Sequence, residues 1–310
     1  VSSDNKMGAY IYGQNRHRSA WDSNGDGFSE LPKLKNQTVG VNAYYRLSPY
    51  SKLNLEYHHM EEFRRGGNRF DLPPHIAEDA NLNGSGKPGL VEQIEHSINT
   101  GGLKFSAFSK DQKHSFNAYA SAQHIVRDSY YSAYGHTTDF TGVLGAQYIY
   151  HFDKLFFMPS DLTGGVEFNH DNLDDKATDM QKYRDAALAE DPTATGDRLQ
   201  QLIDKYTSDP LKQIVNIASA YAQNEWKSEQ WSFLIGGRLD KNSIMNKAIF
   251  SPRANIRYNP TQDINIRFSY AEGFRAPQAF DEDLHISNVG GELISIVRAK
   301  DLKEERSRSV

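Results

Sequence analysis

A short acidic loop near the N-terminus contains the residues of this 310-residue chain that are best suited to chemistry. Oxygen-bearing side chains stand at every second position from Asp22 to Asp26, and Gly27 takes the sixth place counted from Asp22. This spacing curls oxygen donors around a hard cation such as Ca²⁺, and the glycine permits the sharp turn. The predicted ligands are the side chains of Asp22, Asn24, Asp26 and Glu30 and the backbone carbonyl of Phe28.

Two features of the same loop argue against calcium. It departs from an EF-hand because Lys33 stands at the twelfth position, where a bidentate glutamate is required, and because helices are not expected on either side. Asp, Asn, Gly and Ser also favour turns without any ion. A plain polar loop is therefore the alternative interpretation.

The sequence contains no signature of an enzyme. There is no cysteine nucleophile, no G-x-S-x-G, no H-E-x-x-H and no glycine-rich phosphate loop. Glycine pairs such as Gly164-Gly165 and Gly236-Gly237 lie in strand-like segments, and we interpret them as bends or as close approaches of the barrel wall to a plug. We therefore predict that the protein is not an enzyme.

Composition limits the classes of protein to consider. The formal net charge of -5 gives no electrostatic reason to expect nucleic acid as a partner. The absence of cysteine rules out a disulfide framework. No apolar run approaches the ~20 residues of a membrane helix. Barrel strands alternate apolar and polar residues and so dilute their own hydropathy signal, which keeps a membrane β-barrel among the candidates.

Alternation of apolar and polar residues indicates half-buried β-strands along much of the chain. One face of the segment 264–270 carries Ile264, Ile266, Phe268 and Tyr270, and the other carries Asn265, Arg267 and Ser269. The segments 39–47, 53–57 and 231–239 alternate in the same way. Strands of ~10 residues with one apolar and one polar face are typical of a membrane barrel with an aqueous lumen. We expect the apolar set of 264–270 to face lipid.

The connections between these segments predict the topology. Turn-forming residues mark tight turns at 48–51, 110–113, 227–230 and 259–263. The other strand ends are joined by long connections around 17–36, 64–91, 172–212 and 274–300. We predict about twelve antiparallel strands in next-neighbour order, with tight turns on one rim and long loops on the other, which is the outer-membrane pattern.

The connection at 172–212 contains two helical patches. Residues 179–189 are rich in helix-forming types. Asp197 is a candidate N-cap for a second helix, whose apolar stripe consists of Leu199, Leu202, Ile203 and Tyr206. We expect this stripe to pack on neighbouring loops.

A long ordered motif lies near the C-terminus. Its first part, 251–277, starts with Ser-Pro-Arg and ends with Phe274, Arg275, Ala276 and Pro277. Its second part includes Asp301 and Leu302, with Glu304 in place of a proline. As one pattern the motif resembles that of the TonB-dependent outer-membrane receptors, almost completely in the first part and in a degraded form in the second. The strand rhythm extends the resemblance over the rest of the chain.

The resemblance implies an all-β, antiparallel, up-and-down transmembrane β-barrel with short helices in one long external loop. Receptors of this family have a plug domain and barrels of about 22 strands. Residues 1–310 are therefore expected to be part of such a barrel, without the plug domain and the remaining strands. We also expect this piece to be either an incomplete barrel with unpaired edges or a smaller closed cylinder.

The resemblance further implies a receptor located in the cell outer membrane of a Gram-negative bacterium. Such a receptor actively transports a scarce metal chelate, namely cobalamin, a ferric siderophore or haem. The implied partners are the TonB complex of the inner membrane acting through the plug, outer-membrane lipid, the small-molecule ligand, and an accessory lipoprotein at the cell surface. No catalytic residue is expected, because the TonB complex would drive transport by pulling on the plug. The alternatives are a passive porin, an adhesin barrel, or a soluble β-sandwich binding module.

Two ligand sites follow from the same resemblance. Haem receptors of this family have a histidine on the loop between the two parts of the motif, a position that His285 occupies here. Imidazole is a suitable axial ligand for haem iron. Some cobalamin receptors of the family order external loops with calcium, which adds weight to the loop at Asp22–Glu30. An acidic, solvated loop is the alternative for the surroundings of His285, because Asp281 and Asp283 lie close to it in sequence.

Overall fold

A computed structural model describes residues 1–131, 134–177, 187–196, 198–199, 201–202, 211–277 and 302–310. These residues form twelve strands and one short helix with defined bounds. The strands are β1 (Met7–Arg18), β2 (Ser29–Ser48), β3 (Ser51–Gly67), β4 (Val91–Phe108), β5 (His114–Tyr131), β6 (Tyr134–Leu155), β7 (Met158–Ala177), β8 (Leu211–Lys227), β9 (Trp231–Asn242), β10 (Ile249–Tyr258), β11 (Ile266–Arg275) and β12 (Glu305–Ser309), and the helix is α1 (Pro74–Glu78).

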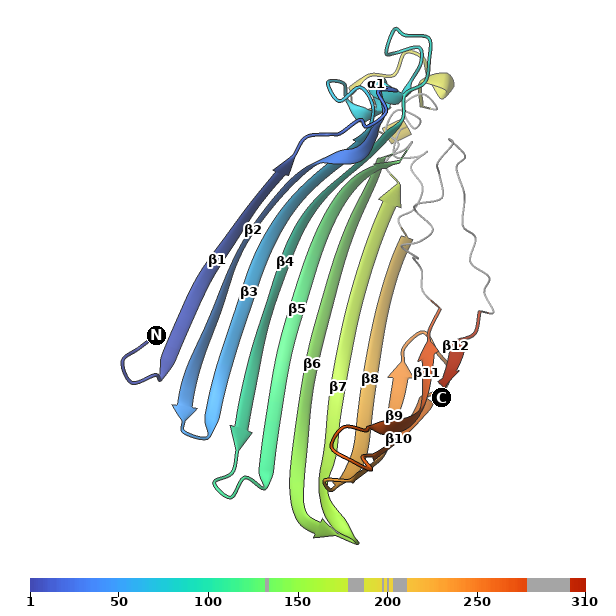
Figure 1. Cartoon of the computed structure of the whole chain (residues 1–310). Helices are drawn as coiled ribbons and strands as arrows, with labels where there is room; N and C mark the ends of the chain where they lie inside the picture. The colour runs from blue at the N-terminus through green and yellow to red at the C-terminus, as the bar shows by residue number, and fades with distance from the viewer. Residues whose placement is uncertain (132–133, 178–186, 197, 200, 203–210, 278–301) are drawn as a thin grey trace.

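All twelve strands belong to one antiparallel sheet whose spatial order equals the sequence order. β1 and β12 lie at opposite ends of that order, and each pairs with one neighbour (Figure 1). The predicted number of strands and the next-neighbour topology are therefore confirmed, and the sheet has open edges rather than a closed cylinder. A β-sandwich needs two sheets facing each other. The single sheet of the described residues contradicts that alternative.

The four predicted tight turns all lie on one rim. They join β2 to β3, β4 to β5, β8 to β9 and β10 to β11 (Figure 1). A fifth tight turn, Phe156-Phe157 between β6 and β7, was not predicted, because phenylalanine is not a turn-forming residue. In the β4–β5 turn, Asp111 accepts hydrogen bonds from the Ser109 hydroxyl and the Lys113 amide, which lower the pKa of its carboxyl group.

The opposite rim is less uniform than predicted. β1 extends to Arg18 and β2 begins at Ser29, so the connection predicted at 17–36 contains only residues 19–28. β5 and β6 are joined by only two residues, 132–133, and β9 and β10 by only six, 243–248. The backbone pairing of β1 with β2 continues past the apolar part of both strands, because backbone hydrogen bonds do not depend on side-chain type. Arg16, for example, pairs with Asn36. The alternation of short turns and long loops is therefore a trend and not a rule.

One face of the sheet carries an unbroken row of apolar side chains. Across β1 to β8, directly paired positions are Ala9, Ala43, Leu55, Leu103, Ala120, Leu144, Phe168 and Ala218. A parallel row continues from Val166 through Ala220 and Leu239 to Phe250. The larger members are exposed, with Leu144 at 61% and Val166 at 57%. We call this surface the apolar face.

The neighbouring row on the opposite surface is polar except for one glycine. From β2 to β9 the paired positions are Tyr44, Asn54, Lys104, Tyr119, Gly145, Glu167, Ser219 and Asp240. We call this surface the polar face. A shift of one residue separates the two rows, because successive side chains on a strand point to opposite sides.

The hairpin of β10 and β11 follows the predicted alternation. Ile266 and Phe268 are more than half exposed on the apolar face. On the other side, Arg267 Nε donates to Asn265 Oδ1 over 2.8 Å. The strand begins at Ile266, so Ile264 and Asn265 precede it and the predicted strand start was two residues too early.

Few apolar residues of the described part are buried, and most of these belong to the loop rim. Ala77 of α1 packs with Val91 and Tyr130, and the Tyr130 hydroxyl donates to Glu78 Oε2 over 2.6 Å. The β3–β4 connection is thus folded onto the top of the sheet (Figure 1). No described helix is long and apolar enough to cross a membrane.

The predicted helical stripe in the β7–β8 connection is confirmed in part. Residues 187–190 are helical. Leu202 is buried with Ala187 and Ala194, and Leu199 packs against them. The described part of the stripe therefore packs within its own connection. Asp197, Ile203, Tyr206 and residues 179–186 lie outside the described residues.

Candidate functional site

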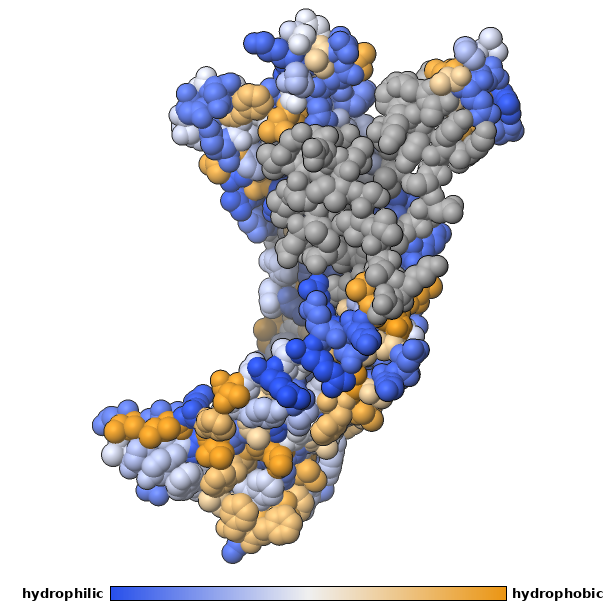
Figure 2. All heavy atoms as spheres, turned by 90° about the vertical axis from the view of Figure 1, so that its right-hand side faces the viewer, coloured by the Kyte–Doolittle hydropathy of each residue, from blue (hydrophilic) through white to orange (hydrophobic). Residues whose placement is uncertain are grey.

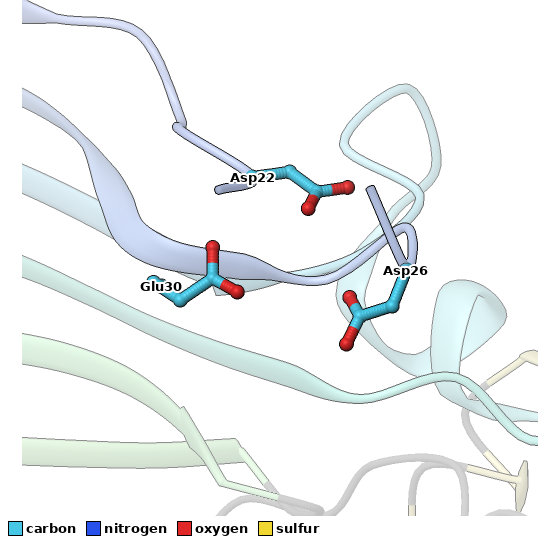
Figure 3. Close-up of side chains that lie close together, drawn as sticks. All are labelled: Asp22, Asp26 and Glu30. Atoms are coloured by element: carbon cyan, nitrogen blue, oxygen red, sulfur yellow. The ribbon is translucent and has the colours of Figure 1, made fainter. Parts of the chain in front are cut away.

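The acidic loop lies between β1 and β2 on the rim that carries the long connections (Figure 1). An isolated bridge closes its base: the amide of Trp21 donates to the carbonyl of Leu31 over 3.0 Å, and the amide of Leu31 donates back over 3.2 Å. Asp22 and Glu30 stand one position inside this bridge. Their carboxylates and that of Asp26 converge, with one oxygen of each within 4.8 Å of the others (Figure 3).

Backbone amides of the loop itself hold these carboxylates in place. Asp22 accepts from the amides of Gly25 and Gly27, over 2.7 and 2.8 Å. Glu30 Oε2 accepts from the amide of Ser23 over 2.6 Å. Gly25 and Gly27 have φ angles of 76° and 90°, which favour glycine. The loop is therefore a defined turn whose shape comes from its own sequence.

Asn24 and Asp26 form a second layer of the same turn. Asn24 Oδ1 accepts from the amide of Asp26 over 2.9 Å, and Asp26 Oδ2 accepts from Asn24 Nδ2 over 3.0 Å. Asp26 Oδ1 accepts from the amide of Phe28 over 2.8 Å. The structure thus brings Asp22, Asp26 and Glu30 together and places Asn24 beside them. All three carboxylates are exposed, and no ion pair joins them to a cation among the described residues. Such a group is chemically suited to a hard divalent cation.

A second candidate region is a hydrogen-bonded network on the polar face. The Tyr119 hydroxyl on β5 donates to Glu167 Oε2 on β7 over 2.5 Å, reaching across β6. Glu167 also accepts from Arg238 of β9 over 2.9 Å. Arg238 Nε donates to Asp240 Oδ1 over 2.8 Å, and the Ser219 hydroxyl donates to the same oxygen over 2.6 Å. Five side chains from four strands therefore form one connected network.

Glycine makes these long reaches possible. Tyr119, Gly145 and Glu167 are successive partners in one row, and a Cβ on Gly145 would lie 2.3 Å from Tyr119 Cζ. Tyr221 repeats the arrangement over Gly165, where a Cβ would lie 2.4 Å from its ring. In both cases the tyrosine ring lies flat on the glycine of the next strand.

Tyr221 of β8 also forms a hydrogen bond to a residue of β6. The Tyr221 hydroxyl donates to Gln147 Oε1 over 2.8 Å, across β7. A group does approach Gly165 closely, but it is a tyrosine of the same sheet, and the predicted approach to a plug stays a prediction. Tyr119, Glu167, Tyr221 and Arg238 were missed as a group by sequence reasoning, since the register of four strands brings them together.

A hollow of about 450 Å³ opens on this network, and its wall includes Glu167, Tyr221, Arg238 and Arg253. Asp240 is almost fully buried, whereas its ion-pair partner Arg238 is one-third exposed. Within the network one guanidinium faces two carboxylates, which leaves a formal charge of -1. The arrangement is suited to holding strands in register and to presenting a polar surface.

The two parts of the C-terminal motif meet where β11 pairs with β12. Phe274 pairs with Arg306, and Arg275 pairs with Glu305. Ala276 and Pro277 follow directly after β11, and Leu302 is exposed before β12. Asp301 and His285 lie outside the described residues, so the predicted haem ligand stays a prediction.

Comparison with known proteins gives one family and a set of similar folds. The family model described as "TonB dependent receptor-like, beta-barrel" matches residues 3–310. A comparison with curated protein sequences gives no match.

Among solved structures, the siderophore receptor PirA from Acinetobacter baumannii has a TM-score of 0.64 at 17% identity, covering 89% of this chain and 39% of that one. PirA from Pseudomonas aeruginosa has a TM-score of 0.59 at 12% identity, covering 89% and 38%. The outer-membrane ferripyoverdine receptor of P. aeruginosa, bound to ferripyoverdine, has a TM-score of 0.61 at 10% identity, covering 90% and 40%. At these identities the likeness shows the fold, and the chain spans less than half the length of each structure.

Proposed function

The chain belongs to the TonB-dependent receptor β-barrel family, and from that premise we propose that it forms part of the wall of an outer-membrane transporter for a scarce metal chelate. Members of this family are transport receptors and not enzymes. The proposal includes energy supplied through TonB, capture of the ligand by external loops, and passage along the polar face of the sheet.

The observation that carries this proposal is the division of the sheet into an apolar and a polar face. A soluble protein would cover the row from Ala9 to Ala218, because exposed apolar area costs about 25 cal/mol per Å². In lipid the same row is in its preferred environment, and an arginine there would cost about 2–4 kcal/mol near the bilayer midplane. The continuous polar row one residue away supplies the surface of an aqueous lumen.

Ferric siderophores are the first substrate class to test. The similar structures include receptors named for siderophores, ferripyoverdine and ferric citrate. Cobalamin and haem remain further candidates, with His285 as the candidate haem ligand. An accessory lipoprotein at the cell surface is a further partner in this proposal.

Uptake measurements test the function and its main rival, a passive porin or adhesin barrel. Cells expressing the full-length receptor are given iron loaded on a panel of catecholate, hydroxamate and carboxylate siderophores, with haem and cobalamin in parallel. We expect saturable uptake of one chelate that is lost in a strain without TonB and after addition of a protonophore. Uptake that is linear with concentration and insensitive to both treatments would identify a porin, and no uptake of any chelate would favour an adhesin.

We propose in addition that the acidic loop binds calcium through Asp22, Asp26 and Glu30, with Asn24 and the carbonyl of Phe28 as further ligands. The convergence of three exposed carboxylates within 4.8 Å supports this. With three carboxylates on a surface loop, we expect a Kd of about 0.1–1 mM, as in extracellular calcium modules.

Asp26→Ala should abolish calcium binding by titration calorimetry and calcium-dependent protection of the loop from protease. Asp263→Ala, an exposed aspartate on the opposite rim, is the matched control and should leave both unchanged. Equal protease sensitivity of the unaltered receptor with calcium and with chelator would remove the calcium proposal and leave a plain loop.

A further inference from the structure

Two pairs of cationic side chains face each other across neighbouring strands where the polar face reaches the short-turn rim. Arg46 of β2 pairs directly with Lys52 of β3, and Arg257 of β10 pairs directly with Arg267 of β11. Figure 2 shows hydrophilic residues beside hydrophobic ones toward this lower end of the molecule. The Cβ atoms of directly opposite residues lie only ~5 Å apart, and like charges at that separation destabilise a sheet. We call these four residues the cationic pairs.

The described part of the chain gives the cationic pairs neutral neighbours only. None of the four residues forms an ion pair with another described residue. Arg46 and Lys52 lie over the ring of Tyr44, at 5.8 and 4.7 Å from its centroid. Arg257 donates to a backbone carbonyl over 3.5 Å, and its buried Nε has no partner there. Arg267 donates to the side-chain carbonyl of an asparagine.

The carboxylates nearest to the cationic pairs on the polar face do not compensate their charge. Three of them already face a lysine or an arginine, namely Asp161, Glu167 and Asp240. Glu225 accepts instead from the Ser232 hydroxyl over 2.8 Å. Lys104 and Arg253 add two more exposed cations to this half of the polar face, and neither forms an ion pair with a described residue. Positive charge therefore remains here, although the whole chain has a formal net charge of -5.

The separation of the two cationic pairs indicates the size of the partner that would compensate them. The β2–β3 and β10–β11 hairpins lie toward opposite ends of the sheet (Figure 1). From β2 to β10 the strand order contains eight steps of ~4.8 Å, which is roughly 38 Å along the curved sheet. A small-molecule chelate cannot contact both pairs at once. A partner that meets both is therefore a folded domain with acidic side chains.

We propose that the cationic pairs bind carboxylates of the plug domain at the short-turn end of the lumen, one group of carboxylates at each hairpin. The proposal rests on the transporter function above, which places the polar face toward the lumen. A carboxylate between Arg257 and Arg267 accepts from both guanidinium groups and converts a repulsive pair into a charge-assisted bridge. The plug is thereby held at two separate places on the wall, and TonB must break these contacts when it pulls the plug.

Carbodiimide crosslinking of the full-length receptor tests this contact directly. The reagent joins a carboxylate to an amine that touches it and leaves guanidinium groups unchanged. Arg257→Lys and Arg267→Lys therefore introduce reactive amines while keeping the charge, and Lys52 is a natural probe of the other pair. Lys35, an exposed lysine on the opposite surface of β2, is the matched control. Heat-modifiable migration on gels confirms that each variant is folded, and chelate uptake is measured in parallel.

We expect mass spectrometry to find Lys52 and each arginine-to-lysine position joined to aspartate or glutamate of the plug, and Lys35 joined to none. The yield should fall at least about fivefold between ~0.1 M and ~1 M salt, because the Debye length shrinks from ~10 to ~3 Å. Crosslinks to barrel carboxylates such as Glu225 alone, or none at all, in a receptor that still takes up chelate would overturn the docking while the transporter proposal stands. A receptor that takes up no chelate would contradict the transporter proposal, and the crosslinks would still decide the docking.

Discussion

The side chains on the two faces of the sheet meet different physical requirements, although both faces belong to the same strands. On the apolar face, side chains such as Leu144 and Val166 extend outward and are more than half exposed, so what matters is their polarity. On the polar face, Tyr119 must lie on Gly145 to reach Glu167, so what matters is shape and hydrogen-bond geometry. One face is therefore adapted to fluid surroundings and the other to fixed neighbours.

A charge on the apolar face should have the largest effect. Val166→Arg should lower the free energy of unfolding in lipid vesicles by about 2–4 kcal/mol, because guanidinium is costly in hydrocarbon. Reversible denaturant unfolding followed by tryptophan fluorescence measures this change. Ser121→Arg places the same charge on an exposed position of the polar face and should cost less than about 1 kcal/mol. Equal losses in the two variants would erase the distinction between the faces.

Added volume on the polar face should have the next largest effect. Gly145→Ala places a methyl group 2.3 Å from the ring of Tyr119, so the ring must leave its position and stability should fall by about 1–3 kcal/mol. Gly142→Ala on the same strand is the matched control, because its new Cβ would meet Phe140 at an ordinary 3.5 Å on the apolar face. A Gly142→Ala variant that loses as much stability as Gly145→Ala would show that the close tyrosine contact has no special role.

Loss of one hydrogen bond should have the smallest effect. Tyr119→Phe keeps the ring on Gly145 and removes the donor to Glu167, which still accepts from Arg238. The expected loss is about 1 kcal/mol, measured by the same unfolding assay. Tyr45→Phe, on the apolar face, should change stability by less than half of that. A larger loss at Tyr45 than at Tyr119 would contradict the assignment of hydrogen bonding to the polar face.

The strands and their facing could be predicted because period-2 alternation is local. Ile266 and Arg267, for example, reveal opposite faces through their types alone. The turn at Phe156-Phe157 could not be predicted from turn propensity, since neither residue favours a turn. The network of Tyr119 with Glu167 depends on the register of three strands over 48 residues, which no local pattern encodes. The acidic loop was found because its ligand spacing is contained within ten residues.

In the proposed membrane arrangement, the apolar face contacts lipid and the polar face contacts water. Spin labels attached to single cysteines at each position from 162 to 169 of β7, in a cysteine-free full-length receptor in vesicles, test it most directly. Even-numbered positions, which include Val166 and Phe168, should be accessible to oxygen. Odd-numbered positions, which include Glu167, should be accessible to a water-soluble nickel complex. Accessibility to the nickel complex at Val166 and Phe168, or no alternation along the strand, would contradict it.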